Sequence, residues 1–178
     1  LADQEQIAVR TLLQACRGTG KTFVFTSGTG VLGQRTAGLW SEDSFAETDA
    51  FTPVRSIASR VETEALVSAA PALGVRGIVL RPPMIWGNGR FLAAELIAQS
   101  VRSTGAACYI GKGLNLYSNV HVDDLAEAFR LAIEIGRDGA LYHCVSGELN
   151  YRQIAERVAR RLGCGTRSVT LDEAIAIW

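Results

Sequence analysis

The sequence has no excess of charge of either sign. Its 18 lysines and arginines balance 18 aspartates and glutamates over 178 residues, so the formal net charge is zero. A neutral chain has no electrostatic basis for binding nucleic acid or an anionic membrane surface. No apolar run reaches the roughly 20 residues of a membrane span, and the opening LADQEQIAVR is acidic and helical, unlike a signal peptide. We therefore expect neither nucleic acid nor a membrane as a partner.

Cysteine pairs and metal-ligand clusters are missing as well. The four cysteines, Cys16, Cys108, Cys144 and Cys164, are far apart and form no C-x-x-C motif. This usage predicts buried thiols in a reducing, cytoplasmic compartment. No group of His, Cys and carboxylate residues has metal-ligand spacing, so we expect no metal. Apolar residues are abundant at 48%, which predicts a packed core.

Helical and extended patterns alternate along the chain. The expected strands cover residues 22–26, 77–80, 107–110, 116–120, 141–145 and 168–170, and the expected helices cover residues 3–17, 55–73, 90–103, 123–135 and 151–162. Residues 28–53 read as a long polar loop. Strands that alternate with helices are typical of an α/β fold with a parallel sheet.

The segment GTGVLG at residues 28–33 follows the first expected strand and matches G-x-G-x-x-G, the dinucleotide-binding pattern. A true dinucleotide turn opens a helix, whose N-terminus holds the diphosphate. After Gly33 the chain reads QRTAGLWSEDS, which has no helical period. We therefore predict a false match, in which residues 30–33 make no diphosphate contact. The P-loop-like GTGKT at residues 18–22 precedes a strand and is predicted to be a helix cap and turn.

Five stretches carry a resemblance to one family. In chain order they are FVFTSGTGVLG, SRVETEALVSAA, GVRGIVLRPPMIWGNG, YSNVHVDDLAEAFRLAIE and ALYHCVSGELNYRQIAERVARRLG. Together they resemble the later part of an extended or atypical short-chain dehydrogenase/reductase, the NAD-dependent epimerase/dehydratase family. The resemblance implies an α/β fold with a Rossmann-like parallel sheet flanked by helices, an NAD or NADP cofactor, and a small-molecule substrate.

The resemblance also implies which part of such a protein this chain represents. The family's glycine-rich cofactor turn and first strands have no counterpart here, so we expect a longer protein. Residues 1–89 would form the second half of the NAD(P)-binding domain. Residues 90–178 would form a substrate-side region interleaved with the last strands of the sheet.

The family's proton-transfer residues are a Ser or Thr, a Tyr, and a Lys four residues after the Tyr. The resemblance places Ser56 at the Tyr position, Arg60 at the Lys position and Gly28 at the Ser/Thr position. Serine lacks a phenol with a pKa of about 10 that could be tuned downward, and arginine does not lose its proton near neutral pH. The chain is therefore expected to have an atypical active site without the Tyr-Lys dyad. A register shifted by one residue, with Arg55 and Ser59 at the dyad, fits no better.

Three groups of candidate site residues follow. The catalytic candidates are Ser27, Ser56 and Arg60; the cofactor-binding candidates are Thr26, Ser27, Gly28, Arg60, Pro82, Pro83 and Met84; and the substrate candidates are Tyr117, Asn119 and His121. Ser27 is included because α/β sheets bind ligands at the carboxyl ends of their strands.

Structural alternatives stay open for several of these residues. Arg60 and Glu64, four residues apart, could form a surface pair. Residues 82–84 could simply terminate a strand. His121 could be a structural histidine, and Asp123 or Asp124 is expected as a helix N-cap.

Two functions of different classes remain. One is an NAD(P)-dependent oxidoreductase or epimerase that acts on a sugar nucleotide or a small carbonyl or alcohol. The alternative is a non-catalytic NAD(P)-binding sensor or partner-binding module of the same fold, which the loss of the dyad favours. The retained pocket stretches and the resemblance to the family favour the enzyme, which is the function we expect. A homodimer is open in either case.

Overall fold

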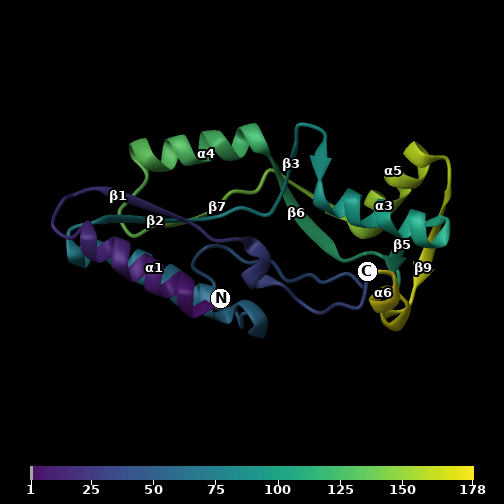
Figure 1. Cartoon of the computed structure of the whole chain (residues 1–178), viewed down its shortest axis with the longest axis horizontal. Coiled ribbons are helices and arrows are strands. Elements are labelled where there is room, and N and C mark those ends of the chain that lie inside the picture. Colours follow the sequence, from purple (N-terminus) through teal and green to yellow (C-terminus); the bar gives the residue numbers. More distant parts are fainter. Residues whose placement is uncertain (1) are drawn as a thin grey trace. The chain divides into compact units, whose positions relative to one another are not determined.

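The structure is a computed structural model that describes residues 2–178 (Figure 1). The chain folds into two compact units. Unit 1 comprises residues 1–34, 44–83 and 123–145, and unit 2 comprises residues 35–43, 84–122 and 146–178. The predicted domain division at residues 89 and 90 remains a prediction, and the compact units cross it because the chain returns to unit 1 at Asp123.

Unit 1 is built on a three-stranded parallel sheet with the order β1-β2-β7. Its elements are α1 (Ala2–Ala15), β1 (Thr22–Thr26), η1 (Thr29–Leu32), η2 (Arg55–Ile57), α2 (Ala58–Ser68), η3 (Ala70–Leu73), β2 (Arg76–Arg81), α4 (Val122–Ile135) and β7 (Leu141–His143). The α/β fold with parallel pairing that the sequence predicts is confirmed.

The central strand β2 carries the core of unit 1. Ile78, Val79 and Leu80 are each at most 1% exposed, as expected for a strand that is covered on both faces. Val79 packs with α1 and α2 in one hydrophobic cluster, whereas Ile78 and Leu80 pack with α4 in another. Figure 1 shows α1 and α4 on opposite sides of the sheet.

Arg76 at the start of β2 holds the end of helix α4. Its guanidinium donates to the carbonyl oxygens of Ala132 at 3.0 Å, Ile133 at 2.5 Å and Gly136 at 2.6 Å. The last carbonyls of a helix have no partner within the helix, and a cation there also complements the helix dipole. Arg76 thus couples strand β2 to the C-terminus of α4.

Unit 2 contains the remaining strands and three helices. Its elements are β3 (Met84–Gly87), β4 (Arg90–Phe91), α3 (Leu92–Thr104), β5 (Ala106–Ile110), β6 (Leu116–His121), β8 (Gly147–Asn150), α5 (Tyr151–Leu162), β9 (Gly165–Val169) and α6 (Leu171–Ile177). One sheet has the order β4-β3-β6-β8, and a second consists of β5 and β9 in parallel. A buried cluster from α3, α5 and β5 forms the main core.

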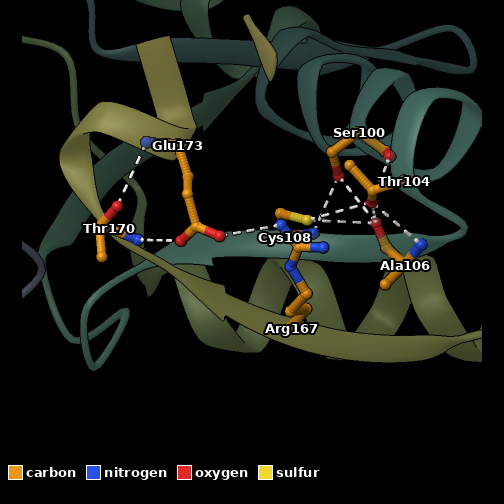
Figure 2. Close-up of polar contacts among 7 residues, drawn as sticks. All are labelled: Ser100, Thr104, Ala106, Cys108, Arg167, Thr170 and Glu173. Atoms are coloured by element: carbon orange, nitrogen blue, oxygen red, sulfur yellow. Dashed lines mark hydrogen bonds and ion pairs between the residues drawn. The ribbon is translucent and has the colours of Figure 1, made fainter. Parts of the chain in front are cut away.

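Side-chain hydroxyls join α3 to β5 (Figure 2). Ser100 is fully buried, and its Oγ donates to the carbonyl of Ile97 and accepts from the backbone amide of Cys108.

At the start of α6, the Thr170 side chain accepts from the amide of Glu173, and the Glu173 carboxylate accepts from the amide of Thr170. This reciprocal capping box satisfies two helix-terminal donors.

Both glycine-rich segments behave as the sequence predicts. All of residues 28–54 are described, and they contain only the four-residue 3₁₀ helix η1, with no α-helix after Gly33. The helix that a true dinucleotide turn would open is therefore absent, as predicted, and the absence of a diphosphate contact at residues 30–33 stays a prediction. At residues 18–22, Gly18 and Gly20 have positive φ, and their amides donate to the carbonyls of Leu73 and Gly74 in a turn before β1.

Some predicted boundaries are wrong. The expected helix 55–73 is split into η2, α2 and η3, because Pro71 lacks the amide that would continue α2. The expected helix 90–103 begins at Leu92, since Arg90–Phe91 pairs with β3. Helix α4 begins at Val122, so Asp123 and Asp124 lie in its first turn instead of capping it.

Other elements were missed or misjudged. Strands β3 and β8 were not predicted, and the expected strand 141–145 ends at His143. Of the four cysteines only Cys108 is buried; the other three are half-buried. Among the described residues, no helix is both long and apolar enough to cross a bilayer.

Candidate functional site

The carboxyl ends of β1 and β2 in unit 1 form the candidate site. The Ser27 amide donates to the carbonyl of Leu80 at 2.8 Å, and the Thr29 amide donates to that of Pro82 at 3.0 Å. The ladder therefore continues past the ends of both strands and holds Ser27–Gly28 beside Pro82. Ligands bind at this edge in open α/β sheets.

A buried ion pair underlies this edge. Arg81 Nε lies 2.9 Å from Glu64 Oε1, and Arg81 Nη2 lies 2.5 Å from Glu64 Oε2. The two side chains are 4% and 3% exposed. The bidentate contact fixes both the distance and the plane of the two groups. It joins the middle of helix α2 to the end of strand β2.

The hydroxyl of Ser27 belongs to the same network. Ser27 is 6% exposed, and its Oγ donates a short hydrogen bond to Glu64 Oε1. Its single proton is therefore committed to a carboxylate that already bonds to Arg81. Ser27 thus lies at the predicted strand end, with its hydroxyl directed at Glu64.

The alternative of a surface pair between Arg60 and Glu64 is wrong. Glu64 is buried and bonds to Arg81, whereas Arg60 Nη2 lies 2.8 Å from Glu5 Oε2 on α1. The Arg60 side chain is 40% exposed. The four-residue spacing is present, but the two side chains bond to different partners.

Arg81 also contacts Phe51 and His143. Its guanidinium carbon lies 5.1 Å from the centre of the Phe51 ring, which is a cation–π distance. Arg81 Nη1 lies 3.2 Å from His143 Nε2. A guanidinium can only donate hydrogen bonds, so His143 Nε2 accepts and carries no proton.

Two titratable groups next to Arg81 have shifted pKa values. Burial is the largest cause that lowers the pKa of His143 below its usual value, although the charge of Glu47 opposes it. The pKa of Glu47 is lowered chiefly because its carboxylate accepts from the His143 backbone amide, at 3.0 Å. This bond connects the loop before α2 to β7.

The free energy of unfolding should decrease in mild acid because of His143. Its folded-state pKa lies below the usual 6.5, so the unfolded chain binds the proton more tightly. The stabilisation is complete above about pH 6.5 and is lost progressively as the pH falls below it. Urea unfolding at several pH values between 7.5 and 5.5 should show this slope, and His143→Gln should flatten it. The control is His121→Gln, which removes the other histidine. Equal slopes for the parent and His143→Gln would contradict the assignment.

The other candidates of unit 1 differ in exposure. Thr26 is exposed at the end of β1, Pro82 is buried and Pro83 is half-buried. Ser56 lies in η2 and is exposed. Ser56 lacks the phenol ring of the tyrosine that the family resemblance places at this position. It also lies outside the Glu64–Arg81 network.

The remaining candidates belong to unit 2. Met84 packs against the core cluster of α3 and α5. Tyr117 stacks edge-to-face on Tyr151, with ring centres 6.0 Å apart. Asn119 Oδ1 accepts from Trp86 Nε1 at 3.0 Å, and His121 stacks on the Trp86 ring. Asn119 and His121 therefore share Trp86 as a neighbour, whereas Tyr117 contacts a different ring.

Sequence reasoning missed Arg81, His143, Glu47 and Phe51. One signal was available: Arg81 ends a continuous apolar run, Gly77-Ile78-Val79-Leu80, where a charged side chain needs a buried partner. The partners come from positions far apart in the chain, so no local spacing identifies them.

A curated relative matches nearly all of this chain. The uncharacterized protein YLL056C of Saccharomyces cerevisiae is 28% identical over 169 residues, which cover 94% of this chain and 54% of that protein. This chain therefore spans about half the length of the curated relative.

Solved structures show the same fold. dTDP-glucose 4,6-dehydratase from Bacillus anthracis, in complex with NAD, aligns with a TM-score of 0.75 at 22% identity, over 95% of this chain and 56% of that chain. RMD from Pseudomonas aeruginosa, complexed with NADPH, aligns with a TM-score of 0.69 at 25% identity, over 92% and 59%.

A family assignment follows from the sequence match. Residues 1–144, most of the chain, match the NAD dependent epimerase/dehydratase family. This match confirms the resemblance carried by the five motif stretches, and the Rossmann-like sheet of unit 1 agrees with it. The chain belongs to the NAD-dependent epimerase/dehydratase family.

Proposed function

We propose that this chain supplies the second half of an NAD(P)-binding domain and part of the substrate region of an enzyme that acts on a sugar nucleotide or a related small carbonyl or alcohol. The family match supports the cofactor, and the dTDP-glucose dehydratase among the structural neighbours supports the substrate class. The observation that carries the proposal is the strand-end edge of Ser27, Gly28 and Pro82, which the Glu64–Arg81 pair holds in place.

The residues at this edge fit the nicotinamide end of the cofactor. Gly28 is extended and half-buried, and an added Cβ would come no closer than 3.6 Å to the Pro82 carbonyl oxygen. At this edge Ser27, Gly28 and Pro82 would line one side of the nicotinamide ring. When bound, this ring would supply or accept a hydride. The glycines of residues 30–33 do not fit the diphosphate, because no α-helix begins there.

Proton transfer in the proposed site is atypical. Ser56 is exposed and Arg60 is paired with Glu5, so neither provides a tunable acid. Ser27 donates its proton to Glu64. General acid/base catalysis contributes about 10²–10⁴-fold, so we expect firm cofactor binding with slow turnover. Tyr117, Asn119 and His121 remain the proposed substrate contacts.

Single-turnover hydride transfer tests this proposal. The full-length protein is titrated with NADH and NADPH and then mixed with a panel of sugar nucleotides and small carbonyls. Ser56→Ala should leave the rate within about twofold, because a serine at this position has no proton to tune. Arg60→Ala should weaken cofactor binding, since Arg60 is a proposed cofactor contact whose partly exposed guanidinium can exchange Glu5 for the cofactor. A collapse of the rate in Ser56→Ala with unchanged cofactor affinity would make Ser56 the working acid.

The second candidate is a non-catalytic NAD(P)-binding module. It is favoured by the three departures at Gly28, Ser56 and Arg60. Cofactor binding without hydride transfer to any member of the panel would support this module over the enzyme.

A further inference from the structure

Unit 2 contains a pocket bounded by α3, α5 and the sheet strands β3, β6 and β8. Its volume is about 360 Å³, within the range of small-molecule sites. Most of the lining is apolar: Trp86, Phe91, Ala94, Leu149, Ile154 and Val158. A second hollow shares Trp86, Phe91, Ala94 and Val158 with it and extends towards the end of α5. An apolar ring would fit between these walls.

The aromatic wall of the pocket is held in a defined orientation. Trp86 is 42% exposed, yet its indole Nε1 donates to Asn119 Oδ1 at 3.0 Å. Its ring also stacks edge-to-face on His121, with centres 4.6 Å apart and planes at 72°. A large exposed aromatic side chain that is fixed by two contacts is pre-organised for stacking with a ligand ring.

Two arginines of α5 face the pocket and its extension. Arg157 lines both hollows, and Arg161, one turn further, lines the extension. Within the described part of the chain neither forms an ion pair, whereas Arg152 on the same helix pairs with Glu156 at 2.9 Å.

Other charges at the walls leave a net positive rim. Arg90 and Glu95 line the extension but pair with each other at 2.7 Å. Glu148 lines the pocket, where it accepts from Ser118 at 3.4 Å. Outside the Arg90–Glu95 pair, the walls carry one carboxylate, Glu148, and two guanidinium groups, Arg157 and Arg161. An anionic group is therefore favoured at the α5 side.

We propose that this pocket binds a small apolar ring that bears an anionic group, with the ring against Trp86 and Val158 and the anion at Arg157 and Arg161. The pocket shares Asn119 with the proposed substrate contacts, and its extension shares His121. The proposal still goes beyond the function above, because both residues serve here to hold Trp86, the ligand contacts are Trp86, Val158, Arg157 and Arg161, and occupation of the pocket needs no cofactor. A nucleobase is disfavoured, since most of the lining is apolar and Asn119 Oδ1 already accepts from Trp86, which leaves a polar base edge with few hydrogen-bond partners.

A pair of fluorescent probes tests the charge and the ring separately. 8-Anilinonaphthalene-1-sulfonate and the uncharged N-phenyl-1-naphthylamine share a ring system and differ in the sulfonate. The sulfonate probe should bind one per chain, and Arg157→Gln should weaken it about tenfold without affecting the neutral probe. The matched control is Arg160→Gln, on the same helix but outside both hollows, which should bind both probes as the parent does. Equal losses in Arg157→Gln and Arg160→Gln, or no binding by the parent, would overturn the proposal.

Filling and competition locate the probe. Ala94→Leu should reduce the binding of both probes. Circular dichroism confirms that the variant is folded. Unchanged binding of both probes by the folded variant would overturn the location. Naphthalene-1-carboxylate should displace the sulfonate probe, and thymidine monophosphate should displace it at least tenfold less well. Equal or better displacement by thymidine monophosphate would overturn the assignment to an apolar ring.

Discussion

Arg81→Met should lower the free energy of unfolding by about 3–5 kcal/mol. The substitution leaves the carboxylate of Glu64, which is 3% exposed, without its bidentate partner. A buried charge without compensation is far more costly than the net contribution of the intact pair. Urea unfolding at pH 7, followed by circular dichroism, measures the change.

Two further variants show whether burial causes this loss. Arg60→Met removes the pair with Glu5, whose side chains are 40% and 28% exposed, and should cost no more than about 1 kcal/mol. The double variant Glu64→Met with Arg81→Met removes both charges and should recover at least half of the loss, because replacing a buried pair with apolar residues is often neutral. A double variant that is no more stable than Arg81→Met alone would show that the unpaired charge of Glu64 does not cause the loss.

Gly77→Ala should cost roughly 3 kcal/mol, at the upper end of overpacking effects. An added Cβ at this position of β2 would clash with the carbonyl oxygen of Val67 and lie 2.9 Å from the Cβ of Ala70. The first of these atoms is backbone of helix α2, so a side-chain rotation cannot relieve the clash. Helix α2 would have to move away from the sheet, and it carries Glu64.

The matched control is Gly30→Ala in unit 1. An added Cβ there comes no closer than 3.7 Å to Ile57 Cδ1, and its stability should stay within about 0.5 kcal/mol of the parent. Thermal unfolding of the two variants side by side gives the comparison. Equal stability of Gly77→Ala and Gly30→Ala would show that α2 and β2 do not pack as closely as the structure has them.

Local patterns predicted the elements whose signal lies within one segment. The strands Thr22–Thr26 and Arg76–Arg81 and the helix Tyr151–Leu162 agree closely with their predicted ranges. Strands β3 and β8 could not be predicted this way. Each has only four residues, and each is a strand because it pairs with β6. Short segments of this kind depend on a partner from elsewhere in the chain.

The candidate site shows the same division. The strand-end position of Ser27 follows from the strand predicted at residues 22–26, which ends directly before it. The structure places Ser27 at the carboxyl end of β1. The partner of Glu64 does not follow from spacing. A residue four positions away lies on the same helix face whether that face is exposed or buried, so the spacing to Arg60 does not show which cation Glu64 meets. The way α2 packs on the sheet turns Glu64 inward to Arg81 and leaves Arg60 beside Glu5.

By itself, the sequence determined the alternation of strands and helices, the apolar strand at residues 77–80 and the absence of a helix after Gly33, because each depends on the order of residues within one stretch. Only the tertiary structure decided which charges meet. The network of Ser27, Glu64, Arg81 and His143, and the positive rim at Arg157, bring together side chains from separate segments. Long-range packing sets those distances, and no local period records them.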